Sequence, residues 1–222
     1  MLVFGHRGAP GFPRHGENTI QSFNKALGAG ADGIEFDIRR CGDGRIVIIH
    51  DETIDRTTNG KGRVSELSYD QLKTFDAGAG DRIPLLSDVL DQFGKRCVLN
   101  IEIKEPGLGS DLKDLVRAKG LEANVIVSAF DWLELESLSG SLPIALLASE
   151  PRDLIVRALD MGAVAIHPRR DIARPLLEPA RRANLRVHVW TVNEPAEIAG
   201  FRDLNVDAIF SDFPERCTTP AS

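Results

Sequence analysis

The feature that most constrains the fold is a regular alternation of short apolar segments with segments of helix length. In the second half of the chain the expected strands are 97–103, 124–128, 143–147, 163–166, 185–191 and 206–210. The helical segments between them are 111–118, 131–138, 152–161, 173–183 and 195–202. Each expected strand is almost continuously apolar, which is typical of a parallel sheet covered by helices on both faces.

The first half of the chain begins in the same way. Its expected strands and helices are a strand at 2–5, a helix from Ile20 to Leu27, strands at 33–39 and 46–49, and a helix at 85–93. Asp43-Gly44 predicts a turn between the second and third strands. The third strand runs into His50, and eight or nine strands are expected in total.

Residues 51 to about 83 interrupt this rhythm, because they are rich in Thr, Asn, Gly and charge and hold one short helical pattern at 67–75. The segment is too short for a core of its own, so we expect an insertion subdomain above the barrel mouth. The sequence thus predicts one domain over residues 1–222, a (β/α)₈ TIM barrel with a small insertion after His50. A doubly wound open sheet is the alternative, but no Gly-x-Gly-x-x-Gly follows the first strand.

Acidic residues on two of these strands predict a metal site. In Ile34-Glu35-Phe36-Asp37-Ile38 the two carboxylates project from one face, because alternate side chains of a strand share a face. Glu102 repeats the pattern on a later strand. Three carboxylates without a thiolate favour a hard divalent cation, either Mg²⁺ or Ca²⁺. The alternative is a structural salt-bridge cluster with Lys104.

Two histidines follow strands close to these acids. His6 follows the first strand and His50 the third, which suits a proton donor and a proton acceptor on opposite sides of a reacting centre. A single histidine is more often a packing or solvated residue, so the pair carries the argument. His167, before Pro168, is a weaker candidate, and His15 and His188 have no comparable setting.

Cations beside the acids indicate an anionic substrate. Arg7 can bind a phosphate with two hydrogen bonds, and Lys104 shares a strand face with Glu102. A cation and a metal in one pocket favour a bridging phosphate ester. A Schiff-base lysine at position 104 is the alternative. Trp190 either lines the mouth or fills a gap between helices.

Composition excludes several other classes. With a formal charge of -6 the 222-residue chain has no basic surface for nucleic acid. No apolar run approaches the roughly 20 residues that span a bilayer, and the N-terminus lacks a signal-peptide core, so we expect a cytoplasmic protein without stable membrane insertion. Three widely spaced cysteines, Cys41, Cys97 and Cys217, fit reduced thiols rather than disulfides or a zinc site.

Taken together, these residues resemble the glycerophosphodiester phosphodiesterase family along essentially the whole chain. The matching segments are His6-Arg7-Gly8, Glu17-Asn18-Thr19, Glu35-x-Asp37, His50-Asp51, Arg56-Thr57-Thr58-Asn59-Gly60, Glu102-Ile103-Lys104, Trp190-Thr191-Val192-Asn193 and Asp207-Ala208-Ile209-Phe210-Ser211-Asp212-Phe213-Pro214. No single segment is decisive, but their order is specific.

The resemblance implies a metal-dependent hydrolase that converts glycerophosphodiesters to an alcohol and sn-glycerol 3-phosphate in lipid and glycerol metabolism. Its implied residue roles are metal binding by Glu35, Asp37 and Glu102, general acid and base catalysis by His6 and His50, phosphate binding by Arg7 and Lys104, pocket lining by Trp190 and site support by Glu17. Attack by the substrate's own glycerol hydroxyl and direct attack by water both fit these roles.

Two other functions compete with this expectation. One is a phospholipase C- or D-like enzyme acting on intact lipid, but the polar stretch 51–63 lacks the exposed apolar residues of an interfacial enzyme. The other is a noncatalytic barrel that binds metal and phosphodiester, against which the histidine pair argues. The chain departs from the family pattern at Gly16, Cys41 and Ala129, where proline, threonine and serine are common; these changes bear on loop geometry and on the leaving group.

Overall fold

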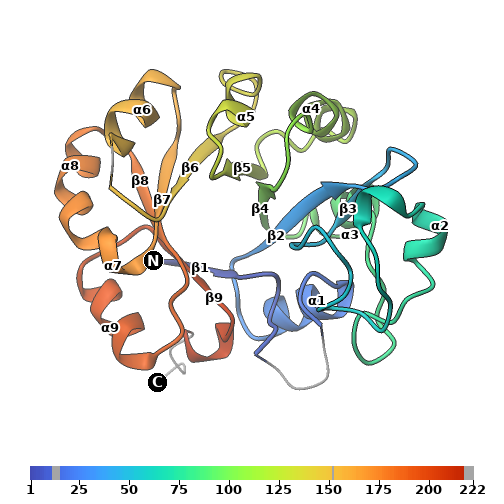
Figure 1. Cartoon of the computed structure of the whole chain (residues 1–222). Helices are drawn as coiled ribbons and strands as arrows, with labels where there is room; N and C mark the ends of the chain where they lie inside the picture. The colour runs from blue at the N-terminus through green and yellow to red at the C-terminus, as the bar shows by residue number, and fades with distance from the viewer. Residues whose placement is uncertain (12–15, 152, 218–222) are drawn as a thin grey trace.

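The computed structural model describes residues 1–11, 16–151 and 153–217. Eight parallel strands close into a barrel, because β1 pairs with β9 on one side and with β2 on the other (Figure 1). The barrel strands are β1 (Leu2–Gly5), β2 (Gly33–Arg40), β4 (Val98–Ile103), β5 (Val125–Ala129), β6 (Ile144–Ala148), β7 (Ala165–Pro168), β8 (Arg186–Val189) and β9 (Ala208–Ser211). The predicted TIM barrel is confirmed.

Helices surround the barrel between successive strands (Figure 1). The α-helices of the barrel are α1 (Ile20–Gly28), α3 (Leu86–Phe93), α4 (Gly109–Ala118), α5 (Leu133–Glu136), α6 (Leu154–Asp160), α7 (Arg170–Ala173), α8 (Leu177–Arg182) and α9 (Pro195–Asp203). The 3₁₀ turns η2 (Arg174–Leu176) and η3 (Pro214–Arg216) lie between α7 and α8 and after β9. Thr19 caps α1 by accepting a hydrogen bond from the Ser22 amide.

The predictions of a single helix at 173–183 and of a helix at 131–138 were wrong in extent. Pro175 lies in η2, between α7 and α8, and its missing N–H explains why one continuous helix does not form. The helix predicted at 131–138 is the single turn α5. Both differences concern the outer layer and leave the barrel strands in place.

The third strand differs from the parallel pattern of the other strands. β3 (Ile46–Ile48) pairs antiparallel with β2 and lies outside the barrel. A tight turn joins the two strands, and Gly44 in that turn has φ of +87°, which favours glycine. His50 therefore approaches the barrel mouth from a side hairpin rather than from the end of a barrel strand.

Alternation along the strands separates two environments. Ile34, Phe36 and Ile38 point outward from β2 into the large core shared with the helices. The buried carboxylates of Glu35 and Asp37 alternate with them and therefore point into the barrel. The apolar core thus holds the strand that presents two acids to the interior.

A second, smaller apolar cluster lies beside the barrel. Cys41, Val47, Ile54, Leu72 and Ile83 are among its buried members. It joins the β2–β3 hairpin to the following segment, which contains η1 (Val64–Glu66) and α2 (Tyr69–Leu72). This cluster fixes the segment after His50 against the barrel rather than leaving it as an unpacked loop.

Candidate active site

Strand register brings the three predicted metal-binding acids together. Asp37 of β2 is the direct neighbour of Glu102 on β4. Glu35 lies two residues before Asp37 and projects from the same face. One carboxylate oxygen from each of the three residues lies within 4.8 Å of the other two, and all three residues are buried.

The three acids oppose one another electrostatically. Burial, together with the charge of Asp37, raises the pKa of Glu35 to about 8 and that of Glu102 to about 6. Burial also opposes ionisation of Asp37, but Arg7 and Lys104 outweigh it and lower the pKa of that carboxyl. The three carboxyls therefore differ in pKa, and a bound cation would favour the ionised form of all three.

The arrangement fits a divalent cation. Oδ1 of Asp37 is buried and accepts no hydrogen bond from the described residues, and Nζ of Lys104 lies 3.5 Å from it. Three carboxylates and no thiolate form an all-oxygen donor set, which suits Mg²⁺ or Ca²⁺. Glu35, Asp37 and Glu102 are the residues that would hold such an ion.

His6 is oriented by an acid from the far end of the chain. Its Nδ1 lies 2.7 Å from Oδ1 of Asp212, and its Nε2 lies 4.0 Å from Oε2 of Glu35. Asn193 in turn holds Asp212, since its side-chain amide donates to Oδ2 at 2.7 Å. Burial lowers the pKa of His6, but the bond with Asp212 and the charge of Glu35 outweigh burial, so the pKa is raised.

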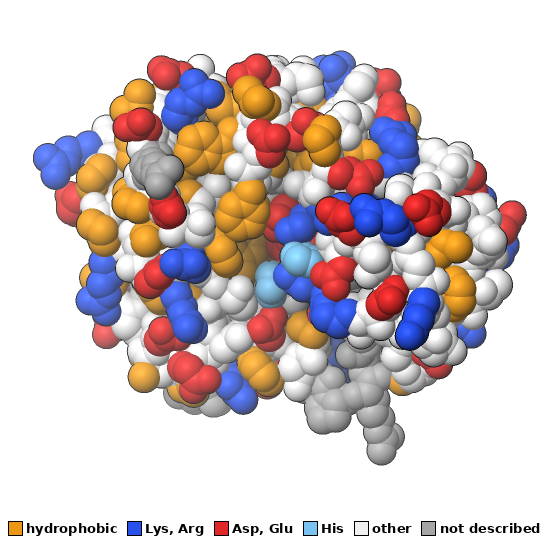
Figure 2. Space-filling view, in the orientation of Figure 1, with side chains coloured by type: hydrophobic (Ala, Val, Ile, Leu, Met, Phe, Trp, Pro, Cys, Tyr) orange, Lys and Arg blue, Asp and Glu red, His pale blue; other side chains and the backbone are white. Residues whose placement is uncertain are grey.

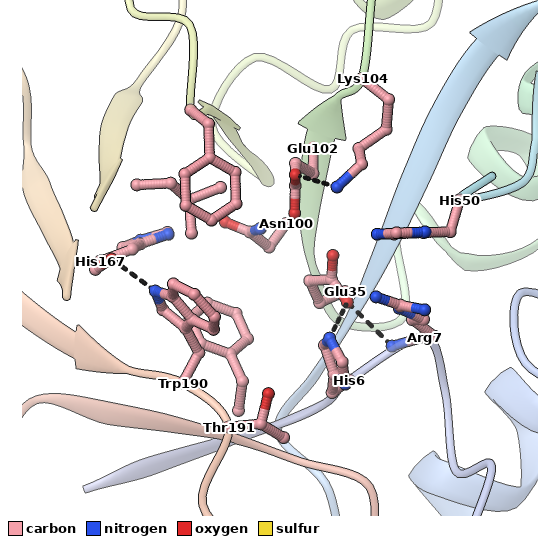
Figure 3. Close-up of a pocket in the computed structure, with 13 residues that line it drawn as sticks. His6, Arg7, Glu35, His50, Asn100, Glu102, Lys104, His167, Trp190 and Thr191 are labelled. Atoms are coloured by element: carbon pink, nitrogen blue, oxygen red, sulfur yellow. Dashed lines mark hydrogen bonds and ion pairs between the residues drawn. The ribbon is translucent and has the colours of Figure 1, made fainter. Parts of the chain in front are cut away.

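His50 has its own carboxylate partner. Its Nδ1 lies 2.6 Å from Oδ1 of Asp51, which leaves Nε2 for the pocket. Burial lowers the pKa of His50, although Asp37 and Asp51 counteract it. Both imidazoles line one pocket together with Arg7 and Lys104 (Figure 3).

The two cations lie against the acidic cluster. Nε of Arg7 is 3.3 Å from Asp37, and its Nη1 donates to Glu17 at 2.9 Å. The backbone amide of Arg7 donates to Glu35 at 2.8 Å. Nζ of Lys104 contacts Glu102 as well as Asp37. Glu17 thus holds the Arg7 side chain against the acidic cluster.

The other side of the pocket is apolar. Trp190 contacts Phe130 edge to face, with ring centroids 5.4 Å apart, and its Nε1 donates to the His167 carbonyl at 2.6 Å. Leu147 also lines this side. Figure 2 shows the histidines in a hollow with charged side chains on one side and hydrophobic ones on the other. A ligand in this pocket would contact charged side chains at one end and aromatic rings at the other.

His167 and His188 are not arranged for proton transfer. His167 is fully buried and stacks on His188, with ring centroids 4.8 Å apart. Burial lowers the pKa of both rings, that of His188 to about 3. His167 lines the pocket wall, but neither of its ring nitrogens has a hydrogen-bond partner among the described residues. His15 lies outside the described residues.

Four polar residues that hydrogen-bond to the site residues were given no role from the sequence. Asp212 and Asn193 orient His6, Asn18 donates to Asp37 at 2.9 Å, and Arg56 binds Glu17 and Asp51. All four lie in loops, and each contacts at least one residue distant in sequence. The backbone of Asn18 is also irregular, with φ of +60°. Only their positions inside the matching motifs could have singled them out.

Comparisons with known proteins show which family the chain resembles. The model of the glycerophosphoryl diester phosphodiesterase family matches residues 6–216. The chain belongs to this family. A glycerophosphodiester phosphodiesterase from Caldanaerobacter subterraneus subsp. tengcongensis is 36% identical, and the match covers 96% of this chain and 95% of the relative.

Solved structures of the family have the same fold. A glycerophosphodiester phosphodiesterase from Agrobacterium tumefaciens superposes with a TM-score of 0.87 at 28% identity, covering 98% of each chain. A phosphodiesterase from Oleispira antarctica, solved with sn-glycerol-3-phosphate, superposes with a TM-score of 0.85 at 25% identity and covers 98% of this chain and 95% of the other. The prediction from the sequence that this protein is a glycerophosphodiester phosphodiesterase is confirmed. In the described part of the chain, no helix has the length and apolar character that crossing a bilayer requires.

Proposed function

We propose that this enzyme hydrolyses glycerophosphodiesters to an alcohol and sn-glycerol 3-phosphate with one bound divalent cation, Mg²⁺ or Ca²⁺. The observation that carries the proposal is the convergence of Glu35, Asp37 and Glu102 in a pocket that His6 and His50 also line. The sn-glycerol-3-phosphate in the structure of the Oleispira antarctica relative supports glycerol 3-phosphate as the product. The product would enter lipid and glycerol metabolism.

The environments of the two histidines support different roles. A raised pKa favours protonated His6, and because Asp212 binds Nδ1, the second proton lies on Nε2 toward the pocket. A lowered pKa favours neutral His50, whose Nδ1–H donates to Asp51 and leaves Nε2 as an acceptor. We assign His6 as the general acid that protonates the leaving alcohol and His50 as the base that deprotonates the attacking hydroxyl.

The other pocket residues bind and orient the diester. Arg7 and Lys104 provide positive charge for the non-bridging phosphate oxygens. When bound, the cation would polarise the phosphate and lower the pKa of a bound hydroxyl. Trp190 and Phe130 present apolar faces to the carbon skeleton at the other end of the pocket. Attack by water or by the substrate's own glycerol hydroxyl is compatible with these positions.

The unit that performs this reaction is the whole barrel. We propose that residues 1–222 form one domain with an insertion subdomain at about 51–83. The packing of this segment onto the β2–β3 hairpin supports the proposal, because the small cluster includes Cys41 and Val47 as well as Ile54 and Ile83. A chain cut at residue 51 would therefore separate parts of one cluster.

The function is tested by assaying release of glycerol 3-phosphate from glycerophosphocholine, glycerophosphoethanolamine, glycerophosphoinositol and glycerophosphoglycerol. Activity should require added Mg²⁺ or Ca²⁺ and disappear after chelation. His6→Gln and His50→Gln should each lower kcat by about 10²- to 10⁴-fold while calorimetric metal binding persists. Full activity in the chelated enzyme or in both variants would refute the proposal.

A further inference from the structure

In the segment after His50, one side chain binds two carboxylates that contact residues of the catalytic pocket. Arg56 forms two bidentate ion pairs, one with each of two carboxylates. Its Nε and Nη2 donate to Asp51 at 2.6 and 3.0 Å. Its Nη1 and Nη2 donate to Glu17 at 2.8 and 2.7 Å. The guanidinium thus joins the loop after β1 to the residue that follows His50.

Each of these carboxylates holds a different pocket residue. Asp51 binds Nδ1 of His50 at 2.6 Å, and Glu17 binds Nη1 of Arg7 at 2.9 Å. Arg56 itself is absent from the pocket lining. The order of contacts is therefore His50, Asp51, Arg56, Glu17 and Arg7, which links the proposed base to the proposed phosphate ligand.

The backbone around Arg56 is built to present this side chain. Ile54 is fully buried in the small cluster beside the barrel. The Thr58 hydroxyl donates to the Ile54 carbonyl at 2.8 Å and accepts from the Gly60 amide at 3.0 Å. Asn59 accepts from the Asp76 amide at 2.8 Å. These contacts hold the motif Arg56-Thr57-Thr58-Asn59-Gly60 in a hydrogen-bonded turn.

We propose that Arg56 is a positioning residue that fixes the distance and orientation between His50 and Arg7 through Asp51 and Glu17. This proposal rests on the proposed function, in which those two residues act on the phosphodiester. An exposed ion pair contributes little to stability, and the Arg56 side chain is 49% exposed. Its effect should therefore fall on turnover rather than on folding.

The chain offers a matched control for Arg56. Arg63 lies in the same segment, is 55% exposed and forms one ion pair with Glu52 at 2.7 Å. Glu52 does not line the pocket that contains His50. Arg63→Ala therefore removes an exposed, ion-paired arginine. It leaves in place the series of contacts that links His50 to Arg7 through Asp51, Arg56 and Glu17.

The first experiment compares steady-state kinetics of Arg56→Ala, Arg56→Lys and Arg63→Ala. We expect Arg56→Ala to lower kcat on the order of tenfold to a hundredfold, with unchanged thermal unfolding, and Arg63→Ala to match the wild type. Arg56→Lys should resemble Arg56→Ala, because an ammonium cannot form two bidentate pairs. Added guanidinium at non-denaturing concentration should partly restore Arg56→Ala. Wild-type turnover in Arg56→Lys would overturn the proposal.

A double mutant separates positioning from a general structural effect. If Arg56 acts through Asp51, Arg56→Ala in an Asp51→Asn background should add little to the loss caused by Asp51→Asn alone. Fully additive losses would show that Arg56 does not act through Asp51. The same background leaves the Glu17 contact of Arg56 in place, so any remaining loss measures that second contact.

A readout without turnover keeps this inference distinct from the proposed function. The ring of His50 faces the charges of Asp37, Asp51, Arg7 and Lys104. In Arg56→Ala, Asp51 pairs with His50 alone, so NMR titration should show a higher pKa for His50 than in Arg63→Ala. If the wild type hydrolyses no glycerophosphodiester but this shift is present, the proposed function fails and the positioning contact stands. An unshifted His50 with wild-type kinetics would refute the contact itself.

Discussion

His6 and Asp212, 206 residues apart in sequence, lie in hydrogen-bond contact, with Nδ1 2.7 Å from Oδ1. Closure of the barrel explains the contact, because β1 pairs with β9 and the two residues follow those strands directly. The carboxylate fixes the ring so that Nε2 faces the pocket. Together with the charge of Glu35, it outweighs the burial that would otherwise lower the pKa of His6.

Asp212→Asn should therefore shift the pH profile. As a general acid, His6 must be protonated, so activity is lost as pH rises through its pKa. Removing the carboxylate lowers that pKa, and the alkaline limb of kcat against pH should move to lower pH. Asp171→Asn, which alters an exposed partner of Arg169, should leave the limb in place. An unchanged alkaline limb in Asp212→Asn would argue that His6 is not the acid.

Metal binding should release protons. Burial raises the pKa of Glu35 to about 8, so this carboxyl is protonated at pH 7 in the metal-free protein and must ionise to hold a cation. Affinity for Mg²⁺ or Ca²⁺ should consequently rise as pH rises from 6 to 8. Calorimetry in buffers of different ionisation enthalpy should show close to one proton released. Equal affinity across this range would contradict the assignment of Glu35.

The same carboxyl should affect folding of the metal-free protein. Its folded pKa lies above the unfolded value of 4.5, so the folded state binds the proton more tightly. Its contribution to stability is complete below pH 4.5 and is lost as pH rises toward about 8. Thermal unfolding between pH 5 and 8 should therefore show a fall in Tm that is smaller in Glu35→Gln. Added cation should reduce this fall in the wild type.

Strand pattern and composition were sufficient to predict the barrel, because a buried parallel strand leaves an almost continuous apolar signature. The same logic predicted that Glu35, Asp37 and Glu102 converge, and the register of β2 against β4 supplies the reason. These features depend on residues close in sequence or on the general rule that parallel strands end at one face.

Other features depend on contacts between loops, for which the sequence has no local signal. The pairing of His6 with Asp212 requires closure in one register, and the two ion pairs of Arg56 require a specific turn in the insertion. The antiparallel β3 was difficult for a related reason. Its apolar run resembles a barrel strand, and only the tight turn around Gly44 distinguishes it.

Gly16 lies where the loop after β1 closely approaches the insertion segment. A Cβ at this position would lie 1.9 Å from the carbonyl oxygen of Ala77, so the loop and the insertion segment approach too closely for any side chain. Gly16→Ala should cost about 1–3 kcal/mol in free energy of unfolding. Gly28→Ala is the control, because a Cβ there meets nothing within 4 Å. Equal stability of the two variants in urea would contradict the close approach.

Lys104 contacts two of the acids, and its role can be separated from that of a Schiff-base amine. Lys104→Met removes a charged hydrogen-bond donor, and we expect a loss of about 2 kcal/mol in transition-state binding, roughly thirtyfold in kcat/KM. Lys104→Arg retains the charge and should lose less. Because a Schiff base requires a carbonyl compound, borohydride in the presence of a phosphorylated aldehyde should leave the wild type active. Irreversible inactivation by borohydride would favour the Schiff-base alternative.

Trp190 should affect substrate binding more than the chemical step. Its ring lines the apolar side of the pocket and is held between Phe130, at 5.4 Å between centroids, and the His167 carbonyl, which accepts from Nε1 at 2.6 Å. Trp190→Phe keeps an aromatic face but loses the hydrogen bond, whereas Trp190→Ala loses both. We therefore expect KM for glycerophosphocholine to rise modestly in Trp190→Phe and by about tenfold in Trp190→Ala, with a smaller change in kcat. A fall in kcat at constant KM in Trp190→Ala would instead place this ring against the reacting phosphate.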